Sequence, residues 1–137
     1  MKFEPLRAEH VLWLRDMDPA FRAHAITTEL ALDMEDGGGW VALDGDPVAI
    51  GGIMVMRPGV GHAWMWFTRR WRRHAREITA RVVVELAECD LPRIEAVVLC
   101  GFDAGHRWLR RLGFTLEAER LRRWDGTADY ALYARFS

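Results

Sequence analysis

Hydrophobic and polar positions in the first third of the chain repeat at the spacing of helices. Residues 8–17 place apolar side chains at helical intervals, and Asp18-Pro19 is typical of a helix start, with Asp as the cap and Pro in the first turn. We therefore expect one helix over residues 8–17 and a second from residue 18 to about Met34. A short strand over residues 3–7 precedes them, and the glycines at 37–39 end the second helix.

The pattern changes to that of strands after residue 39. Residues 40–43 and 48–56 are largely apolar and flank the turn Asp44-Gly45-Asp46, which predicts a hairpin. The glycines at 51–52, inside the second arm, predict a bulge or a close approach by another backbone or a ligand. A further turn leads into an apolar, aromatic segment at 60–67, which suits a buried strand.

A cationic segment follows that strand directly. Residues 69–76 hold five arginines and a histidine, and the helix after them places Ile78, Val82 and Leu86 at four-residue steps. Because a helix N-terminus already carries partial positive charge and free backbone N–H groups, arginines there favour a bound polyanion, typically a phosphate. A solvated basic turn is the alternative, and charge by itself favours that alternative.

The last third of the chain predicts a strand, a short helix and a final pair of strands. Gly113 is the expected helix stop, in a left-handed conformation that costs glycine least. The predicted elements cover residues 94–99, 104–112, 114–119 and 130–136. Strands and helices are therefore mixed in one domain over residues 1–137.

Composition and charge narrow the classes of function. The chain has 137 residues, of which 50% are hydrophobic, and a formal net charge of −1, so we expect a folded domain and no nucleic-acid partner. Basic clusters at 69–76, 107–111 and 120–123, against acidic residues in the N-terminal half, suit a small anionic ligand. The two cysteines fit no metal motif and indicate a reducing, cytoplasmic location. No window approaches the ~18 apolar residues of a membrane span.

Two motifs and the order of the elements resemble the GNAT superfamily of acyl-CoA-dependent N-acetyltransferases over nearly the whole chain. Residues 107–114, RWLRRLGF, are similar to the end of the family's last helix, where the glycine stops the helix and the phenylalanine starts a strand. Residues 70–75, RWRRHA, are similar to the family's pyrophosphate loop, with Arg73 where the family has its central glycine. The resemblance implies an α/β (α+β sandwich) GNAT-like fold, with a mixed, mostly antiparallel sheet of six to seven strands splayed at the centre and about four helices.

The resemblance also implies acetyl-CoA (coenzyme A) as the cofactor. Backbone N–H groups of the strand before the cationic segment would hold the thioester carbonyl, the segment itself would hold the phosphates, and the later helix would add contacts. The cofactor-binding residues implied are Met65, Trp66, Phe67, Arg70, Arg72, Arg73, His74, Ala75, Asp103 and Trp108. Helix capping is an equally good explanation of Asp103.

We expect the catalytic base to be Glu29 or His62. The histidine has a suitable ordinary pKa near ~6.5, and the glutamate would lie near the acceptor side if the second helix lines that cleft, as in the family. A packed strand histidine and a solvated helical glutamate are the alternatives. The acid that the family often uses is a tyrosine at the position of Leu109, which cannot donate a proton. We assign both tyrosines of the chain and Cys100 to packing.

Two hypotheses of different classes follow. The first is an N-acetyltransferase that moves an acetyl group from acetyl-CoA to an unidentified small-molecule or peptide amine. The second is a catalytically silent phage or prophage protein that acts through protein contacts in the virion or the infected host. Residues 64–68 and 103–114 motivate it, because they resemble phage-encoded GNAT-like proteins of the internal virion protein A type. Arg73 and Leu109 favour the second hypothesis, and the arginine loop favours the first, which we place ahead.

Overall fold

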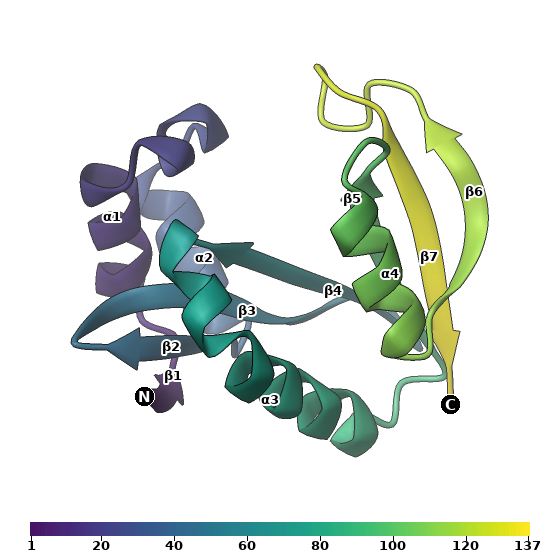
Figure 1. The fold of residues 1–137 in the computed structure, drawn as a ribbon, viewed down its shortest axis with the longest axis horizontal. Coiled ribbons are helices and arrows are strands. Elements are labelled where there is room, and N and C mark those ends of the chain that lie inside the picture. Colours follow the sequence, from purple (N-terminus) through teal and green to yellow (C-terminus); the bar gives the residue numbers. More distant parts are fainter. The chain divides into compact units, whose positions relative to one another are not determined.

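The computed structural model describes residues 1–137, apart from the side chains of residues 22 and 23. The chain forms four α-helices, two short 3-10 helices and seven strands. Figure 1 draws these elements as a ribbon. In chain order the elements are β1 (Lys2–Pro5), α1 (Ala8–Met17), η1 (Pro19–His24), α2 (Thr28–Asp36), β2 (Trp40–Asp44), β3 (Asp46–Arg57), β4 (Val60–Phe67), η2 (Arg69–His74), α3 (Ala75–Glu88), β5 (Arg93–Leu99), α4 (Asp103–Arg111), β6 (Thr115–Leu121) and β7 (Tyr130–Phe136).

The strands form one sheet in the order β1-β2-β3-β4-β5-β7-β6. The ladders β1–β2, β2–β3, β5–β7 and β6–β7 are antiparallel. Strands β4 and β5 pair in parallel, from Val60 opposite Arg93 to His62 opposite Glu95. The prediction of a mixed, mostly antiparallel sheet with four helices is therefore confirmed.

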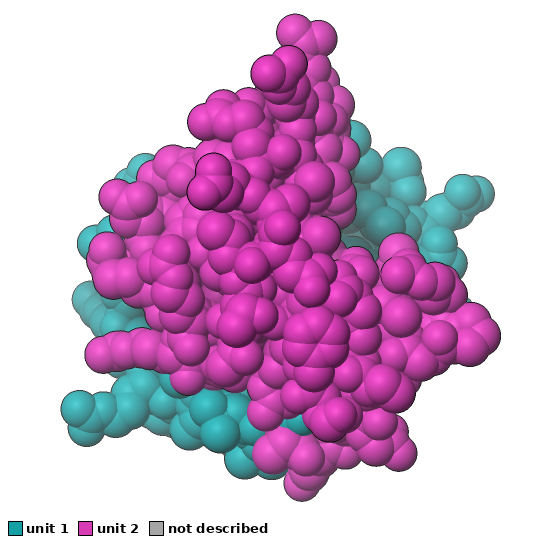
Figure 2. Space-filling view, turned by 90° about the vertical axis from the view of Figure 1, so that its right-hand side faces the viewer, with its two compact units in different colours: residues 1–54, 65–86 teal, residues 55–64, 87–137 magenta. Residues whose placement is uncertain are grey.

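The chain divides into two compact units, which Figure 2 colours separately. Unit 1 comprises residues 1–54 and 65–86, and unit 2 comprises residues 55–64 and 87–137. The boundaries between them fall inside β3, inside β4 and near the end of α3, so each unit holds a part of these elements. Within the described residues, no helix combines the length and the apolar character that crossing a membrane requires.

The core of unit 1 lies between the β2–β3 hairpin and α3. Residues Trp40 and Ala42, two positions apart on β2, share one face of the strand and are buried together with Ile78 of α3. The predicted helical spacing is confirmed, because Ile78 and Leu86 are buried and Val82 packs against the same cluster. This packing fixes the start of α3 relative to the hairpin turn.

The single helix expected from residue 18 to residue 34 is wrong, because the structure divides this segment. Asp18 does act as a cap, and its Oδ1 accepts the N–H of Ala20 at 2.9 Å, but the helix it starts is the short η1. The chain then turns at Ala25, whose φ of 49° is left-handed and ends the helix. A second cap begins α2, where Thr27 Oγ1 accepts the N–H of Leu30 at 3.1 Å.

The β2–β3 ladder shifts its register beside the turn. Gly51 pairs with Trp40 in regular register, whereas the register shifts where Leu43 pairs with Pro47. Proline has no N–H to donate, so an irregular position beside the turn accommodates it better than a regular ladder does. The turn itself is confirmed, with Gly45 at a φ of +72°.

Unit 2 packs α4 against the sheet formed by β5, β7 and β6. Alternate residues of β5 are buried, and Ala96 pairs with the fully buried Tyr133 of β7. A Cβ on Gly105 of α4 would lie 2.6 Å from Val98 Cγ2, so the helix approaches β5 as closely as a glycine permits. Gly113 ends the helix at a φ of +91°, which confirms its predicted left-handed conformation.

Candidate functional site

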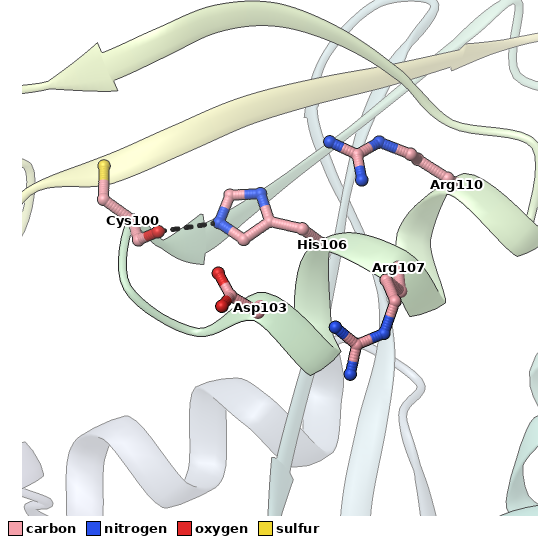
Figure 3. Close-up of a pocket in the computed structure, with 5 residues that line it drawn as sticks. All are labelled: Cys100, Asp103, His106, Arg107 and Arg110. Atoms are coloured by element: carbon pink, nitrogen blue, oxygen red, sulfur yellow. Dashed lines mark hydrogen bonds between the residues drawn. The ribbon is translucent and has the colours of Figure 1, made fainter.

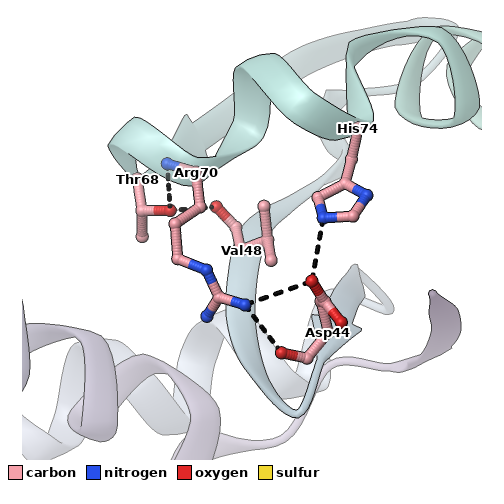
Figure 4. Close-up of polar contacts among 5 residues, drawn as sticks. All are labelled: Asp44, Val48, Thr68, Arg70 and His74. Carbon is pink, nitrogen blue, oxygen red and sulfur yellow. Dashed lines mark hydrogen bonds and ion pairs between the residues drawn. The ribbon is translucent and has the colours of Figure 1, made fainter.

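The cationic segment between β4 and α3 is anchored at its first turn by Thr68. The Thr68 hydroxyl donates to the carbonyl oxygen of Val48 at 2.9 Å and accepts the N–H of Arg70 at 3.2 Å (Figure 4). The Thr68 side chain is buried, and its backbone N–H also donates to the Val48 carbonyl oxygen. The segment therefore starts from a fixed point on β3 and continues as η2 directly into α3.

Two of the predicted phosphate ligands converge on one carboxylate of the hairpin turn. Arg70 Nη2 donates to Asp44 Oδ2 at 3.2 Å and to the Asp44 carbonyl oxygen at 2.8 Å. His74 Nε2 lies 3.0 Å from the same Oδ2 (Figure 4). The hydrogen bond with His74, aided by the charge of Arg70, holds the pKa of Asp44 below its usual range. Asp44 was not among the residues that the sequence singled out for a site.

The rest of the cationic segment faces solvent. Arg69, Arg72 and Arg73 are exposed, and Ala75 is the first residue of α3. Trp71 turns the other way and packs on Phe67, with ring centroids 4.7 Å apart. The structure therefore brings Arg70 and His74 together and directs neighbouring arginines to water.

The predicted backbone site on β4 is surrounded by aromatic rings. The Trp66 ring stacks on His24 at 4.6 Å with an interplanar angle of 13°, and it meets Phe21 edge-on at 5.9 Å. Met65 and Phe67 pack on the core cluster of unit 1. These contacts hold the strand in place, which is what a backbone donor for an oxyanion requires.

Unit 2 holds an open pocket of about 440 Å³ beside α4, lined by Cys100, Asp103, His106, Arg107 and Arg110 (Figure 3). Two guanidinium groups against one carboxylate give the lining a positive balance. Asp103 is the first residue of α4 and not its cap, which is Phe102 without a side-chain hydrogen bond. Trp108, the other predicted ligand on this helix, is half-buried.

His106 and Tyr133 form a hydrogen-bonded pair behind this pocket. His106 Nε2 lies 3.1 Å from the Leu99 carbonyl oxygen and 3.0 Å from that of Cys100, so this nitrogen carries the proton. His106 Nδ1 is then free to accept the Tyr133 hydroxyl, at 2.6 Å. Both ring nitrogens are engaged by the protein, and the pair positions the end of β5. The assignment of Tyr133 to packing therefore missed a hydrogen bond that only the fold creates.

The two candidate bases lie in different compact units. His62 is half-buried on β4 of unit 2, where it pairs with Glu95 and stacks on Trp124 at 6.1 Å. Burial lowers the pKa of His62, against a smaller opposing effect of the Glu95 charge. Glu29 is exposed in the first turn of α2, where a carboxylate is favoured by the helix dipole alone.

The remaining candidate groups are metal-ligating side chains, the two cysteines and Leu109. Among these residues, no group of three or more His, Cys, Asp or Glu side chains could hold a metal ion. Cys89 and Cys100 are free thiols and partly buried. Leu109 is 7% exposed, so the position of the family's tyrosine is a core position here.

These features belong to a GNAT acyl-CoA N-acyltransferase fold, because solved structures of that class match this chain over nearly its whole length. An acetyltransferase of the GNAT family from Streptococcus pneumoniae matches with a TM-score of 0.74 and 14% identity, covering 99% of each chain. A GNAT phosphinothricin acetyltransferase from Sinorhizobium meliloti, in complex with AcCoA, has a TM-score of 0.76 and 14% identity over 98% of this chain and 87% of that chain. The protein yncA from Salmonella typhimurium, with its cofactor acetyl-CoA, has a TM-score of 0.75 and 12% identity over 98% and 92%. No family model and no curated protein matches the sequence.

Proposed function

We propose that this chain is an acyl-CoA-dependent N-acetyltransferase that moves an acetyl group from acetyl-CoA to an amine in the cytoplasm. The observation that carries the proposal is the cationic segment at the junction of β4 and α3, on a fold whose solved examples include complexes with acetyl-CoA. At this junction the first turn of the helix offers backbone N–H donors in fixed positions to a phosphate. The arginine side chains add positive charge that can move to meet it.

The proposed roles follow the local geometry of each unit. Arg70, Arg72, Arg73 and His74 bind the phosphates together with the first turn of α3, and the backbone N–H groups of residues 65–67 hold the thioester carbonyl. Asp103 and Trp108, which the resemblance also implies as cofactor-binding residues, lie on α4 of unit 2. Each of these assignments uses a residue whose backbone is fixed by a helix or a strand.

The proposed base removes the proton of the acceptor ammonium before the amine attacks the thioester. His62 suits this role because burial lowers its pKa, so the ring is neutral near neutral pH and can accept a proton. Glu29 is the second candidate, as an exposed carboxylate on α2. We place His62 first, because its half-buried ring has fixed neighbours.

Calorimetry with acetyl-CoA tests the phosphate assignment. The double variant Arg70→Ala, Arg73→Ala should bind more weakly by roughly 1.5–3 kcal/mol for each charged hydrogen bond lost. Arg122→Ala is the matched control, since it removes an exposed arginine from the region after β6 and should leave the affinity unchanged. Equal affinities of the double variant and the wild type would remove the cationic segment from the site.

A thiol-release assay with acetyl-CoA and a panel of amines, polyamines and peptide N-termini tests the chemistry. Loss of the general base should lower the rate by about 10²–10⁴-fold and leave cofactor affinity nearly unchanged. The variants are His62→Ala and Glu29→Gln, and the base is the residue whose loss produces this split. Wild-type rates in both variants would refute both residues as the base and would leave the proposed acetyltransferase activity standing.

A catalytically silent GNAT-fold protein is the second candidate, and Leu109 favours it. The buried leucine provides no hydroxyl where the family often places its acid, so the leaving thiolate would need water or another side chain as proton source. Such a protein would act through protein contacts, in a phage virion or an infected host. Absence of both acetyl-CoA binding and turnover with every acceptor would select this candidate.

A further inference from the structure

We propose that Asp44 is an internal competitor for the anion that binds the cationic segment, and so sets the affinity of that site. The inference rests on the proposed role of the cationic segment in phosphate binding. In the structure, the Asp44 carboxylate already occupies donors of Arg70 and His74 that an incoming phosphate oxygen would use. A ligand must therefore displace this carboxylate or share its donors.

The geometry makes the carboxylate a substitute for one oxygen of a phosphate. Both basic side chains direct a nitrogen at the same oxygen, Oδ2, at 3.2 Å from Arg70 and 3.0 Å from His74 (Figure 4). Carboxylates and phosphates are both oxyanions that accept charged hydrogen bonds from guanidinium and imidazolium groups. Two donors on one oxygen are the arrangement that a terminal phosphate oxygen would also accept.

The ion pair between Asp44 and Arg70 is weak enough for a ligand anion to replace the carboxylate. The side chains of Asp44 and Arg70 are 49% and 42% exposed, and ion pairs at such positions are weak because water screens them. Asp44 is the last residue of β2 and pairs with Asp46 through the main chain, so its side chain can rotate into water while that pairing stays in place. The carboxylate can therefore leave when a stronger anion arrives.

Arg70 is also held by a hydrogen bond that does not involve the Asp44 carboxylate, so the charge of Asp44 can be removed while Arg70 keeps a partner. Arg70 Nη2 also donates to the main-chain carbonyl oxygen of Asp44 at 2.8 Å, and this acceptor remains whatever the side chain is. Replacing the carboxylate by an amide therefore removes the competing charge and keeps a partner for the arginine. Asp44→Asn thus isolates the competition.

The experiment is a calorimetric titration of the full chain with inorganic pyrophosphate and, separately, with coenzyme A. We expect Asp44→Asn to bind both probes roughly two- to fivefold more tightly than the wild type, the range set by the loss of one exposed ion pair. Asp46→Asn is the matched control, because it removes the same charge from the same turn at a residue outside the Arg70 and His74 contacts. Its gain should be smaller than that of Asp44→Asn.

The outcomes separate this inference from the proposed function. Tighter pyrophosphate binding by Asp44→Asn without any coenzyme A binding would support the competitor and overturn the proposed function. Equal coenzyme A affinities of the wild type and Asp44→Asn would support the proposed function and refute the proposal that Asp44 competes with the anion. Weaker binding by Asp44→Asn, a gain no larger than that of Asp46→Asn, or binding of neither probe by either protein would also overturn it.

Discussion

At the scale of single residues, the polar contacts of the candidate site and of the pocket join side chains that lie 26 to 30 positions apart in the sequence. Asp44 reaches Arg70 and His74 across 26 and 30 positions, and His106 reaches Tyr133 across 27. Each contact places a polar group where the local segment alone would leave it to water. The positions of these groups therefore depend on the tertiary fold.

The pKa of Asp44 should respond to the loss of its histidine partner. In His74→Ala we expect this pKa to rise toward the ordinary aspartate value, because the hydrogen bond with His74 is the largest cause of its lowering. Carboxyl-carbon NMR across an acid titration measures the change. Arg72→Ala is the control, since it removes a charge from the same segment without touching Asp44, and an equal shift in that variant would contradict the prediction.

Removing the hydroxyl of Tyr133 should destabilise the protein. Tyr133→Phe leaves His106 Nδ1 without its partner behind the pocket, and an unsatisfied group of this kind costs about 1–3 kcal/mol in the free energy of unfolding. Tyr130→Phe removes a hydroxyl that bonds Asp125 in an exposed turn, and its cost should be smaller. Urea unfolding compares the two, and equal stabilities would show that the His106 contact contributes nothing.

At the scale of elements, local patterns predicted most of the fold. The bounds of α1, β4 and β7 match the predicted segments, because their apolar periodicity and their turn residues point to the same ends. The helix expected over residues 18–34 failed for a different reason. The left-handed Ala25 and the cap at Thr27 divide it, and neither residue carries a strong breaking signal in the sequence. The register shift beside Pro47 was missed because it depends on pairing.

The contact between α4 and β5 gives a prediction at this scale. Gly105→Ala places a Cβ 2.6 Å from Val98 Cγ2 and 2.7 Å from the Phe102 ring, so the helix must shift. Overpacking of this kind costs about 1–3 kcal/mol in the free energy of unfolding. Gly101→Ala is the control, because a Cβ there meets no atom of the described residues within 4 Å. Thermal and urea unfolding measure both, and a Gly105→Ala protein as stable as Gly101→Ala would contradict the tight packing.

At the scale of the whole molecule, the sequence predicted the segments that form the candidate site but not the contacts between side chains of different segments. The cationic segment and its place before a helix were readable, because basic residues and helical spacing are local signals. Asp44 was readable only as a turn residue, because the contacts that give it a role join the turn to η2. The pocket beside α4 likewise needs the fold, since its lining combines the end of β5 with one side of a helix.

The charge distribution predicts that acid destabilises the protein. A carboxyl whose folded pKa is lowered binds its proton more readily when unfolded, so its stabilisation is present above the unfolded pKa and is lost as pH falls through the folded one. The ordinary values are 3.8 for aspartate and 4.5 for glutamate. His62, with a pKa lowered from 6.5, acts in the same direction below that pH. The carboxyls concerned are Asp16, Asp44, Glu117, Asp125 and Asp129.

Urea unfolding in a series from about pH 7 to about pH 3 measures this dependence. We expect stability to fall with pH, most steeply below the ordinary carboxyl values. Asp125→Asn should flatten the acid limb, because Asp125 accepts the N–H groups of Thr127 and Ala128 and the hydroxyl of Tyr130. A free energy of unfolding that stays constant over this range would contradict the prediction.

The sharing of Arg70 between a turn and a ligand also has an evolutionary consequence. A substitution at Asp44 changes how strongly the cationic segment holds an anion, so selection on that affinity acts on a residue 26 positions away from the arginine. Related chains should therefore vary at these two positions together. Where both the arginine and the histidine are replaced by neutral residues, the acidic residue at the turn should no longer be retained, because both of its partners are gone.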